Sequence, residues 1–186
     1  MSNILLWLQL LKKIKVTGAV AFSSDSLIKK MLTTVDFSKA GVIVELGAGS
    51  GCITEWIGRK IKPHSTLLVF EIDEVFCKKL RNKFAAPNIH IINDSAENME
   101  KYLLKITGKI EADFIISSLP FSIIDDDVRE KIMLSIQHVL MPQSLYVQYG
   151  YNKKKYKEIL NHFYTIKTSF VLGNLPPAYV FNCRLQ

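Results

Sequence analysis

The sequence predicts an α/β fold built on a doubly wound, mostly parallel sheet of seven strands. Three observations predict it. Short apolar runs alternate with longer helical patterns from residue 41 onward, a glycine-rich turn directly follows the first run, and two strand-like segments near the C-terminus have no helix between them. Such alternation is typical of βαβ units, whose strands lie parallel and are buried on both faces. Two strands joined without a helix pair antiparallel, so the sheet is expected to end in a hairpin.

The N-terminal residues 1–16 are predicted to form an amphipathic helix. Apolar residues recur at helical spacing from Ile4 to Ile14, and the narrow polar stripe contains Lys12 and Lys13 but no acid. A basic helix with a wide apolar face and a tryptophan, here Trp7, can lie in a membrane interface. The same pattern also describes an ordinary helix that packs on its own domain, so both interpretations stay open.

A second helix is predicted to begin near Ser24, with Ser23 or Ser24 as its N-cap. The predicted strands cover residues 42–46, 67–71, 89–92, 114–117, 145–148, 166–172 and 179–185. The predicted helices between them cover residues 52–61, 74–84, 97–106, 126–140 and 152–162. A chain of 186 residues supports one sizeable core, so we expect residues 1–186 to form a single domain.

The charge balance points to anionic partners without choosing one. The chain carries 24 Lys and Arg against 17 Asp and Glu, a formal net charge of +7. A basic protein of this size is attracted to phosphates, whether on nucleic acid or on an anionic membrane. Surface lysines that simply maintain solubility would give the same balance.

The apolar stretches and the cysteines indicate the cellular compartment in which the protein is expected. No stretch reaches the ~18 consecutive apolar residues of a spanning helix, and residues 1–16 lack a basic leader region and a cleavage site. Cys52, Cys77 and Cys183 lie far apart without a Cys-x-x-Cys pair, which is typical of reduced cytosolic thiols.

The glycine-rich turn is the first candidate for ligand binding. Residues 45–51 read Glu-Leu-Gly-Ala-Gly-Ser-Gly, at the end of the first predicted strand. Glycines allow a tight turn and the close approach of a ligand across the carboxyl edge of a sheet. The spacing, with Cys52 in the last position, fits the dinucleotide fingerprint poorly. The candidate cofactor-binding residues here are Glu45, Gly47, Ala48, Gly49 and Gly51.

Two acidic positions follow the next two strands. Glu71, before Ile72, ends the second strand, where a carboxylate can accept hydrogen bonds from both ribose hydroxyls of an adenosine ligand. Asp94, followed by Ser95 and Ala96, ends the third strand and is placed to reach an adenine amino group. Asp94 is equally suited to start the helix that follows, and the sequence does not separate these roles.

The end of the fourth strand has the composition of a substrate pocket. Residues 117–121 read Ser-Ser-Leu-Pro-Phe. Proline fixes the turn and cannot donate a hydrogen bond, so we expect the carbonyls around it to face the pocket as acceptors. A pocket lined by acceptors and an aromatic ring suits an amine nucleophile.

These segments resemble known families. The turn at 47–51, Glu71 and the region of Asp94 resemble the shared cofactor motifs of class I S-adenosylmethionine-dependent methyltransferases. Ser-Ser-Leu-Pro-Phe is similar to the Asn-Leu-Pro-Tyr of rRNA adenine dimethyltransferases, and closer to the Ser-Ser-Leu-Pro of bacterial phospholipid N-methyltransferases. Residues 18–24, Tyr149-Gly150 and Asn-Leu-Pro-Pro-Ala at 174–178 resemble further motifs of the phospholipid enzymes. Phe22, where proline is usual, and Ser50, where threonine is frequent, depart from the pattern.

The resemblance implies a Rossmann-like methyltransferase sheet with S-adenosyl-L-methionine as cofactor. It implies methyl transfer to the amine headgroup of a phospholipid, from phosphatidylethanolamine towards phosphatidylcholine. The protein would be cytoplasmic and peripheral to the inner face of the membrane, with helix 1–16 docked on the anionic surface. The expected amine-orienting residues are Ser117, Ser118, Leu119 and Pro120, with Ser117 also near the cofactor. The expected substrate contacts are Phe121 as an aromatic wall, and Tyr149 and Tyr179 as donors to the lipid phosphate.

The main alternative is an RNA adenine-N6 methyltransferase, which the positive charge and the Leu-Pro-Phe step would also fit. Against it, Ser117 stands where an Asn or Asp would accept a hydrogen bond from the adenine amino group. The sequence also ends after the seventh strand, without an additional helical domain to grip RNA. An idle binding module is disfavoured by the intact cofactor motifs, and a soluble amine stays open as a substrate.

No metal is expected. Asp125, Asp126 and Asp127 directly precede a predicted helix, where acids stabilise the positive N-terminal end. The four histidines have no ligand spacing.

Overall fold

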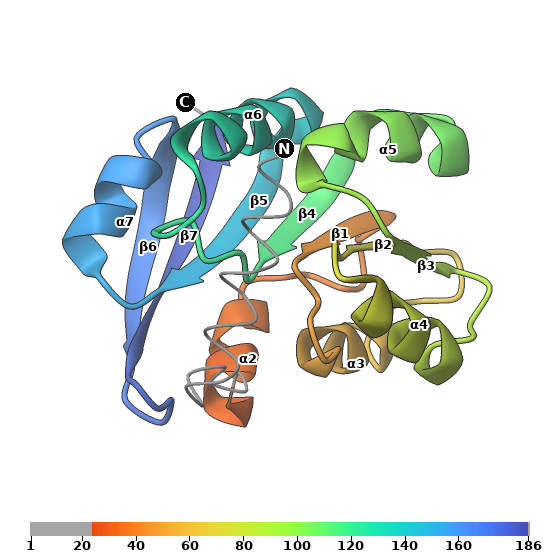
Figure 1. Ribbon diagram of the computed structural model, residues 1–186, viewed down its shortest axis with the longest axis horizontal. Coiled ribbons are helices and arrows are strands. Elements are labelled where there is room, and N and C mark those ends of the chain that lie inside the picture. Colours follow the sequence, from red (N-terminus) through yellow and green to blue (C-terminus); the bar gives the residue numbers. More distant parts are fainter. Residues whose placement is uncertain (1–23, 186) are drawn as a thin grey trace.

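The structure, a computed structural model, describes residues 24–185 as a seven-stranded sheet between two layers of helices (Figure 1). The strands are β1 (Val42–Leu46), β2 (Thr66–Phe70), β3 (Ile89–Ile92), β4 (Ala112–Ser117), β5 (Leu140–Gly150), β6 (Phe163–Val171) and β7 (Ala178–Leu185). The helices are α2 (Asp25–Leu32), α3 (Cys52–Gly58), α4 (Glu74–Lys83), η1 (Ala96–Asn98), α5 (Met99–Thr107), α6 (Asp126–Val139) and α7 (Lys153–Ile159). The predicted helix 1–16 and the motif residues 18–23 lie outside the described residues.

The predicted α/β sheet with an antiparallel C-terminal hairpin is confirmed. The strand order is β3-β2-β1-β4-β5-β7-β6, with β1 to β5 parallel and β7 antiparallel to both β5 and β6. At the carboxyl ends, Leu46 pairs with Phe70 and with Ser117. The residues that follow these three positions therefore lie along one edge of the sheet, which we call the carboxyl edge.

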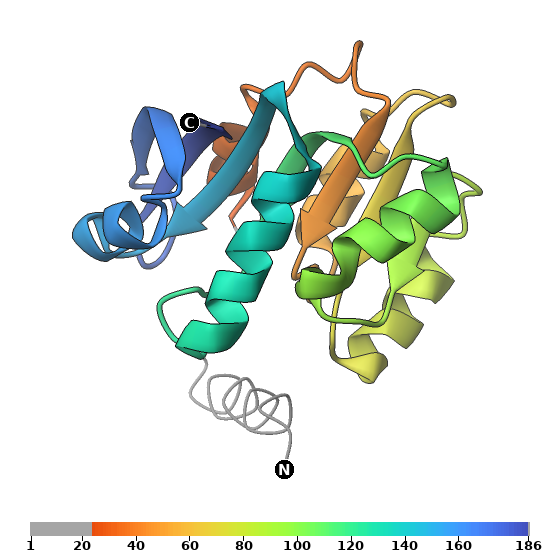
Figure 2. The same ribbon diagram turned by 90° about the horizontal axis from the view of Figure 1, so that it is seen from above.

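The two faces of the sheet are covered by different helices (Figure 2). Buried residues of α2, α3 and α4, such as Leu27, Ile57 and Leu80, share one core cluster. Buried residues of α5, α6 and α7, such as Leu103 and Ile132, share the other. Coverage on both sides explains why strands β1 and β2 consist almost entirely of apolar residues.

Helix α2 begins where the sequence predicts. The Ser24 side chain accepts a hydrogen bond from the Leu27 backbone N–H at 3.2 Å, so Ser24 is the N-cap. Its apolar residues Leu27, Ile28, Met31 and Leu32 are all buried. Helix α6 is capped by Asp125, whose side chain accepts from the Asp127 N–H, so the acidic run does stabilise a helix start.

Several elements differ from their predicted bounds, and three differences have a clear structural reason. Strand β5 begins at Leu140, not at residue 145, because the chain pairs with β4 through an irregular register as soon as α6 ends. Helix α7 ends at Ile159, since strand β6 already starts at Phe163. The predicted helix 97–106 is divided into η1 and α5. Within residues 24–185, no helix has the length and apolar character needed to cross a bilayer.

The β6–β7 hairpin projects past the carboxyl edge. Gly150, the last residue of β5, pairs with Tyr179, the second residue of β7. The turn at residues 172–177, which we call the hairpin tip, therefore lies beyond the end of β5. The tip is tied to the start of α2, because the Asn174 side-chain oxygen accepts from the Ser24 backbone N–H at 3.0 Å.

Candidate active site

The glycine turn and Glu71 form one hydrogen-bonded unit. Gly47, Gly49 and Gly51 have φ angles of 79°, 54° and 82°, in the left-handed region that favours glycine. The Gly49 N–H donates to Glu71 Oε2 at 2.7 Å, and the Asp73 N–H donates to Glu71 Oε1 at 2.9 Å. Each carboxylate oxygen thus keeps a second lone pair for a ligand hydroxyl. Burial raises the pKa of Glu71 and the charge of Asp73 adds to the rise, while the backbone N–H groups of Asp73, Gly49 and Ile72 oppose it.

Glu45, at the end of β1, has no hydrogen-bond partner among residues 24–185. Its side chain is 1% exposed, and neither carboxyl oxygen meets a donor of these residues with normal hydrogen-bond geometry. Burial raises the pKa of Glu45 to about 8; the nearby Thr54 hydroxyl and backbone lower it only in part, and the Glu71 charge adds to the rise. A buried polar group without a partner is costly, so this carboxyl has unused capacity for a polar group of a ligand.

The glycine turn leaves space on one side. Within the part of the chain that the structure describes, a Cβ on Gly49 would meet no atom within 4 Å, whereas a Cβ on Gly51 would lie 2.6 Å from Leu80 Cδ2 and 2.8 Å from Phe84 Cε2. Gly51 is therefore needed for the packing of α4, while Gly49 borders open space at the carboxyl edge. A ligand can approach the backbone closely at Gly49.

This difference gives a prediction. Gly51→Ala should lower the free energy of unfolding by about 1–3 kcal/mol more than Gly49→Ala, because both variants carry the strain of positive φ but only the first overpacks the core. Urea unfolding of both variants measures the difference. Equal losses would show that α4 shifts to make room for the methyl group.

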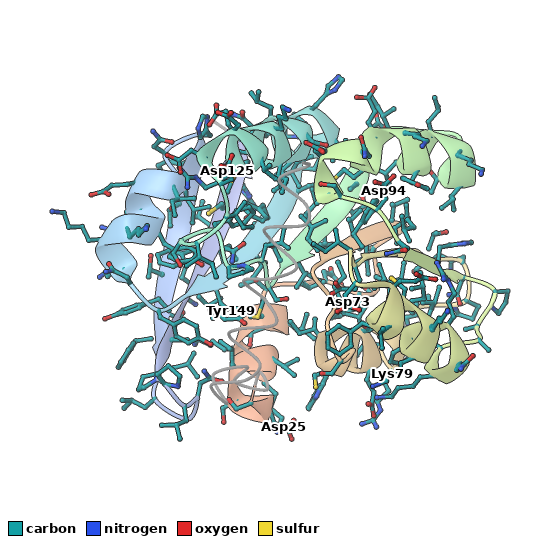
Figure 3. The ribbon with its side chains drawn as sticks, in the orientation of Figure 1. Asp25, Asp73, Lys79, Asp94, Asp125 and Tyr149 are labelled. Atoms are coloured by element: carbon teal, nitrogen blue, oxygen red, sulfur yellow. The ribbon has the colours of Figure 1, made fainter. Side chains whose placement is uncertain are left out.

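Asp94 is hydrogen-bonded to residues at the start of η1 and α5. Its Oδ1 accepts from the Ser95 N–H at 2.7 Å and the Asn98 amide at 2.9 Å, and its Oδ2 accepts from the Tyr102 hydroxyl at 2.8 Å. Burial opposes ionisation, but these hydrogen bonds still hold the pKa of Asp94 below its usual value. Figure 3 shows Asp94 at the start of α5 and Asp73 at the start of α4. Asp94 is not the N-cap that the sequence offered as one of its two roles, because the N-caps of η1 and α5 are Ser95 and Asn98. Its bonds to Asn98 and Tyr102 tie it to α5 instead.

The other residues of the predicted cofactor set lie beside these groups. Ala48 and Ala96 are buried, and Ile72 and Ser95 are half-buried. All belong to the loops that follow β1, β2 and β3 at the carboxyl edge.

The Ser-Ser-Leu-Pro-Phe loop packs on the glycine turn. The Ser118 N–H donates to the Leu46 carbonyl at 3.0 Å, and the Ser118 hydroxyl donates to the Gly47 carbonyl. A Cβ on Gly47 would lie 2.8 Å from Leu119 Cδ2. When the shared Leu-Pro step is matched, Ser118 and not Ser117 stands in the asparagine position of Asn-Leu-Pro-Tyr, which corrects the position assigned from the sequence. Ser117 is fully buried and its hydroxyl accepts from the Leu119 N–H at 3.2 Å.

Gln148 is a residue that the sequence analysis missed. It is fully buried on β5, where its side-chain amide donates to the Leu119 carbonyl at 3.1 Å and its Oε1 accepts from the Tyr146 hydroxyl at 2.8 Å. The Leu119 oxygen also accepts from the Phe121 N–H at 2.9 Å. Two donors occupy its two lone pairs, so this carbonyl has little capacity for a substrate amine, contrary to the expectation for the loop. A polar residue within an apolar strand was the available signal.

Phe121 does not form an open aromatic wall. Its side chain is 0% exposed and belongs to the core cluster that also contains Ile124 and Met133. The chain turns back after Pro120, as the bond from Phe121 N–H to the Leu119 carbonyl shows, and this turn directs the ring inward. The predicted substrate contact is therefore corrected to a packing role.

The structure does not bring Tyr149 and Tyr179 together. Tyr149 packs against the core cluster of the α2–α4 face, and Tyr179 packs against that of the α5–α7 face. Figure 3 shows Tyr149 on the side that carries α2. The Tyr179 ring has Lys153 Nζ 6.0 Å from its centroid, so Tyr179 has a cation beside it. One phosphate cannot be reached from both faces of a sheet.

The sequence is similar to a known family and to several characterised proteins. The pattern of the family described as "Ribosomal RNA adenine dimethylase" matches residues 21–124, more than half of the chain. An ornithine lipid N-methyltransferase from Singulisphaera acidiphila is 29% identical over 170 residues, with 90% of this chain and 88% of that protein covered. A ribosomal RNA small subunit methyltransferase A from Ureaplasma urealyticum is 30% identical over 126 residues. That match covers 66% of this chain and 42% of the relative, so the chain spans less than half of its length.

A solved structure shares the fold. The 1,6-didemethyltoxoflavin-N1-methyltransferase of Burkholderia thailandensis, which contains S-adenosylhomocysteine, superposes with a TM-score of 0.72 at 11% identity. The superposition covers 100% of this chain and 92% of that chain. Together with the hydrogen-bonded unit of glycine turn and Glu71, these matches establish that the chain belongs to the ribosomal RNA adenine dimethylase family and is a class I S-adenosylmethionine-dependent methyltransferase.

Proposed function

We propose that this protein transfers methyl groups from S-adenosylmethionine to the amine headgroup of a membrane lipid, with phosphatidylethanolamine and ornithine lipid as the two candidate substrates. The observation that carries the proposal is the extent of similarity. The match to the ornithine lipid enzyme covers 90% of the chain and so includes most of the part after residue 124, where the family pattern ends. That part contains α7 and the β6–β7 hairpin.

The residues at the carboxyl edge fit S-adenosylmethionine. Glu71 retains a free lone pair on each oxygen for the two ribose hydroxyls. Glu45 offers a buried carboxyl without a partner for a polar group of the ligand. Gly49 leaves the backbone open to close approach. We assign the ribose to Glu71 and the adenine side to Ile72, Asp94, Ser95 and Ala96.

Ser118 is the residue best placed to orient the amine. When bound, S-adenosylmethionine would supply a methyl group already activated by its sulfonium. The protein has to hold the headgroup nitrogen in line as a neutral amine, after its ammonium proton has passed to solvent, and then to exclude water. Holding the two reactants in line can lower the barrier by roughly 7–11 kcal/mol. The Ser118 hydroxyl donates a hydrogen bond to the Gly47 carbonyl, so its oxygen lone pairs stay available to accept from an amine N–H. Ser117, Leu119 and Pro120 hold the loop.

The lipid phosphate is assigned to one face of the sheet. Tyr179 and Lys153 lie together next to α7, where a phenol and an ammonium can both donate to a phosphate. Tyr149 contacts the Tyr151 ring on the other face and is not assigned to the phosphate.

Methyl transfer from labelled S-adenosylmethionine tests the proposal. The full chain is incubated separately with vesicles that contain phosphatidylethanolamine, with vesicles that contain ornithine lipid, and with unmodified small-subunit rRNA. Label is expected in one or both lipids. Label in rRNA alone would establish the RNA alternative and reject the lipid proposal, and label in none of the three would also reject it.

A matched pair of variants links the activity to the site. Ser118→Ala is expected to lower lipid methylation at least tenfold, and Ser38→Ala, in the exposed loop before β1, is expected to leave it unchanged. Equal activity of the two variants would remove Ser118 from the site.

A further inference from the structure

The hairpin tip exposes two leucines. Among the described residues, Leu175 and Leu172 are the most exposed large apolar side chains, at 87% and 76%. Phe170, at the end of β6, is 51% exposed, and Tyr151, directly after β5, is 45% exposed. Single exposed apolar residues are ordinary on protein surfaces, but a group of them at one edge indicates a contact surface.

The tip is held in one shape by polar contacts beneath the leucines. Asn174 is 2% exposed and donates from its side-chain amide to the Pro176 carbonyl at 2.7 Å. Its oxygen accepts from the Ser24 N–H, and Gly173 packs closely against Ser26. The hydrogen bonds of buried Asn174 therefore stabilise a turn from which Leu172 and Leu175 point outward.

Helix α7 adds a basic surface whose first residue, Lys153, lies near the strands that lead to the tip. Lys153, Lys154, Lys155 and Lys157 are all exposed, and the helix contains a single acid, Glu158. Lys153 lies over the Tyr179 ring, whose centroid is 4.7 Å from that of Phe170 on β6. The lysines of α7 thus continue into the aromatic and apolar residues that lead to the tip.

The same surface reaches the substrate loop. Lys155 Nζ donates to the Ser122 carbonyl at 2.8 Å, one residue after Ser-Ser-Leu-Pro-Phe. The tip follows β6 at the carboxyl edge, where β4 delivers Ser118, and α7 begins at the same edge, three residues after the end of β5, before it runs back along the sheet. Figure 1 shows α7 beside β6, with the start of the helix toward the end of β5 and the β6–β7 turn below it.

We propose that the hairpin tip and α7 form a docking surface for an anionic lipid bilayer. Leu172 and Leu175 enter the boundary between headgroups and acyl chains, and the α7 lysines contact headgroup phosphates. Binding to an anionic membrane surface is stabilised by apolar side chains that enter the headgroup region and by lysines that are attracted to the lipid phosphates. A nucleic acid would engage the lysines but leave the leucines in water, so the combination favours lipid. The inference deepens the proposed function by stating how the substrate loop faces the headgroup layer.

Co-sedimentation of the full chain with phosphatidylglycerol–phosphatidylethanolamine vesicles tests the surface. Leu172→Ser/Leu175→Ser is expected to bind roughly ten- to a hundredfold more weakly, because two leucines no longer leave water. The matched control is Leu104→Ser/Leu134→Ser, two leucines of α5 and α6 that are 56% and 53% exposed, and it is expected to bind like the parent. Equal binding of both variants would overturn the proposal.

Charge-matched variants test the lysines. Lys154→Gln/Lys157→Gln should weaken vesicle binding about fivefold per residue, whereas Lys39→Gln/Lys78→Gln, with the same change of net charge, should have a much smaller effect. Leu175→Trp should show a blue-shifted emission increase with anionic vesicles that Leu104→Trp lacks. Absence of this difference would contradict insertion of the tip.

Two other occupants of the surface are distinguishable. Self-association of the parent that is lost in Leu172→Ser/Leu175→Ser, with vesicle binding unchanged, would assign the tip to a second copy. Loss of rRNA binding in that variant, again with vesicle binding intact, would assign it to RNA. Either result would overturn the lipid surface.

Activity separates this inference from the proposed function. With a short-chain aminolipid in solution, the tip variant should retain the parent rate, and with vesicles it should lose rate in proportion to binding. Tip-dependent vesicle binding without methylation of any aminolipid would reject the proposed substrate and leave the docking surface standing. Aminolipid methylation on vesicles that does not depend on the tip would reject the docking surface and leave the proposed substrate standing.

Discussion

Glu71→Ala is expected to weaken binding of S-adenosylmethionine by roughly 5- to 150-fold, which corresponds to the roughly 1–3 kcal/mol of lost hydrogen bonds to a charged acceptor. The carboxylate is 7% exposed at the end of β2 and lies against the Gly49 N–H. Without it, the ribose hydroxyls lose their acceptor, and Gly49 loses the group that orients the turn. Titration calorimetry with S-adenosylmethionine and with S-adenosylhomocysteine measures the change.

Two further variants separate ligand contact from damage to the turn. Glu71→Gln keeps one acceptor oxygen, so its loss of affinity should lie between those of the parent and Glu71→Ala. Glu74→Gln, an exposed acid on α4, should bind like the parent. Unfolding in urea identifies any variant whose weak binding comes from a destabilised fold. An unchanged affinity in a folded Glu71→Ala protein would show that the ribose lies elsewhere.

The elements of the parallel sheet were predictable because their signals are local. Each buried strand is a short apolar run, and Ser24 and Asp125 precede their helices in the positions that N-caps occupy. Glu71 was predictable for a related reason. The carboxyl ends of neighbouring parallel strands meet at one edge, so the residue after β2 has to lie near the turn after β1.

The substrate side depends on contacts that no local pattern records. Whether the Leu119 carbonyl is free depends on Gln148, which is 29 residues away and reaches it only because β4 and β5 pair in a particular register. Tyr149 and Tyr179 were grouped because a phosphate accepts hydrogen bonds from phenols. Their faces follow from the pairing of Gly150 with Tyr179, and a shift of one residue would place both rings on the same face.

Glu45 makes the protein without ligand less stable as the pH rises. The pKa of Glu45 is about 8 in the folded protein, because the side chain is buried without hydrogen-bond partners, against 4.5 when it is exposed. Between these values the folded state binds one proton more than the unfolded state, so the free energy of unfolding falls with increasing pH by up to ~1.4 kcal/mol per pH unit. From about pH 5.5 to about pH 7.5 the loss should reach roughly 2–3 kcal/mol.

Urea unfolding across this range, in the parent and in Glu45→Gln, isolates the effect. The amide does not ionise, so the free energy of unfolding of the variant should depend much less on pH than that of the parent. At low pH the variant should be less stable than the parent only by the cost of fitting the amide into the site. A residual slope of the same sign is expected from Glu71, whose pKa burial also raises. Glu74→Gln serves as the exposed control and should retain the full slope. Parallel profiles for the parent and Glu45→Gln would mean that the Glu45 carboxyl is ionised in the folded protein, and the partnerless acid beneath the glycine turn would then need a bound cation or water to explain it.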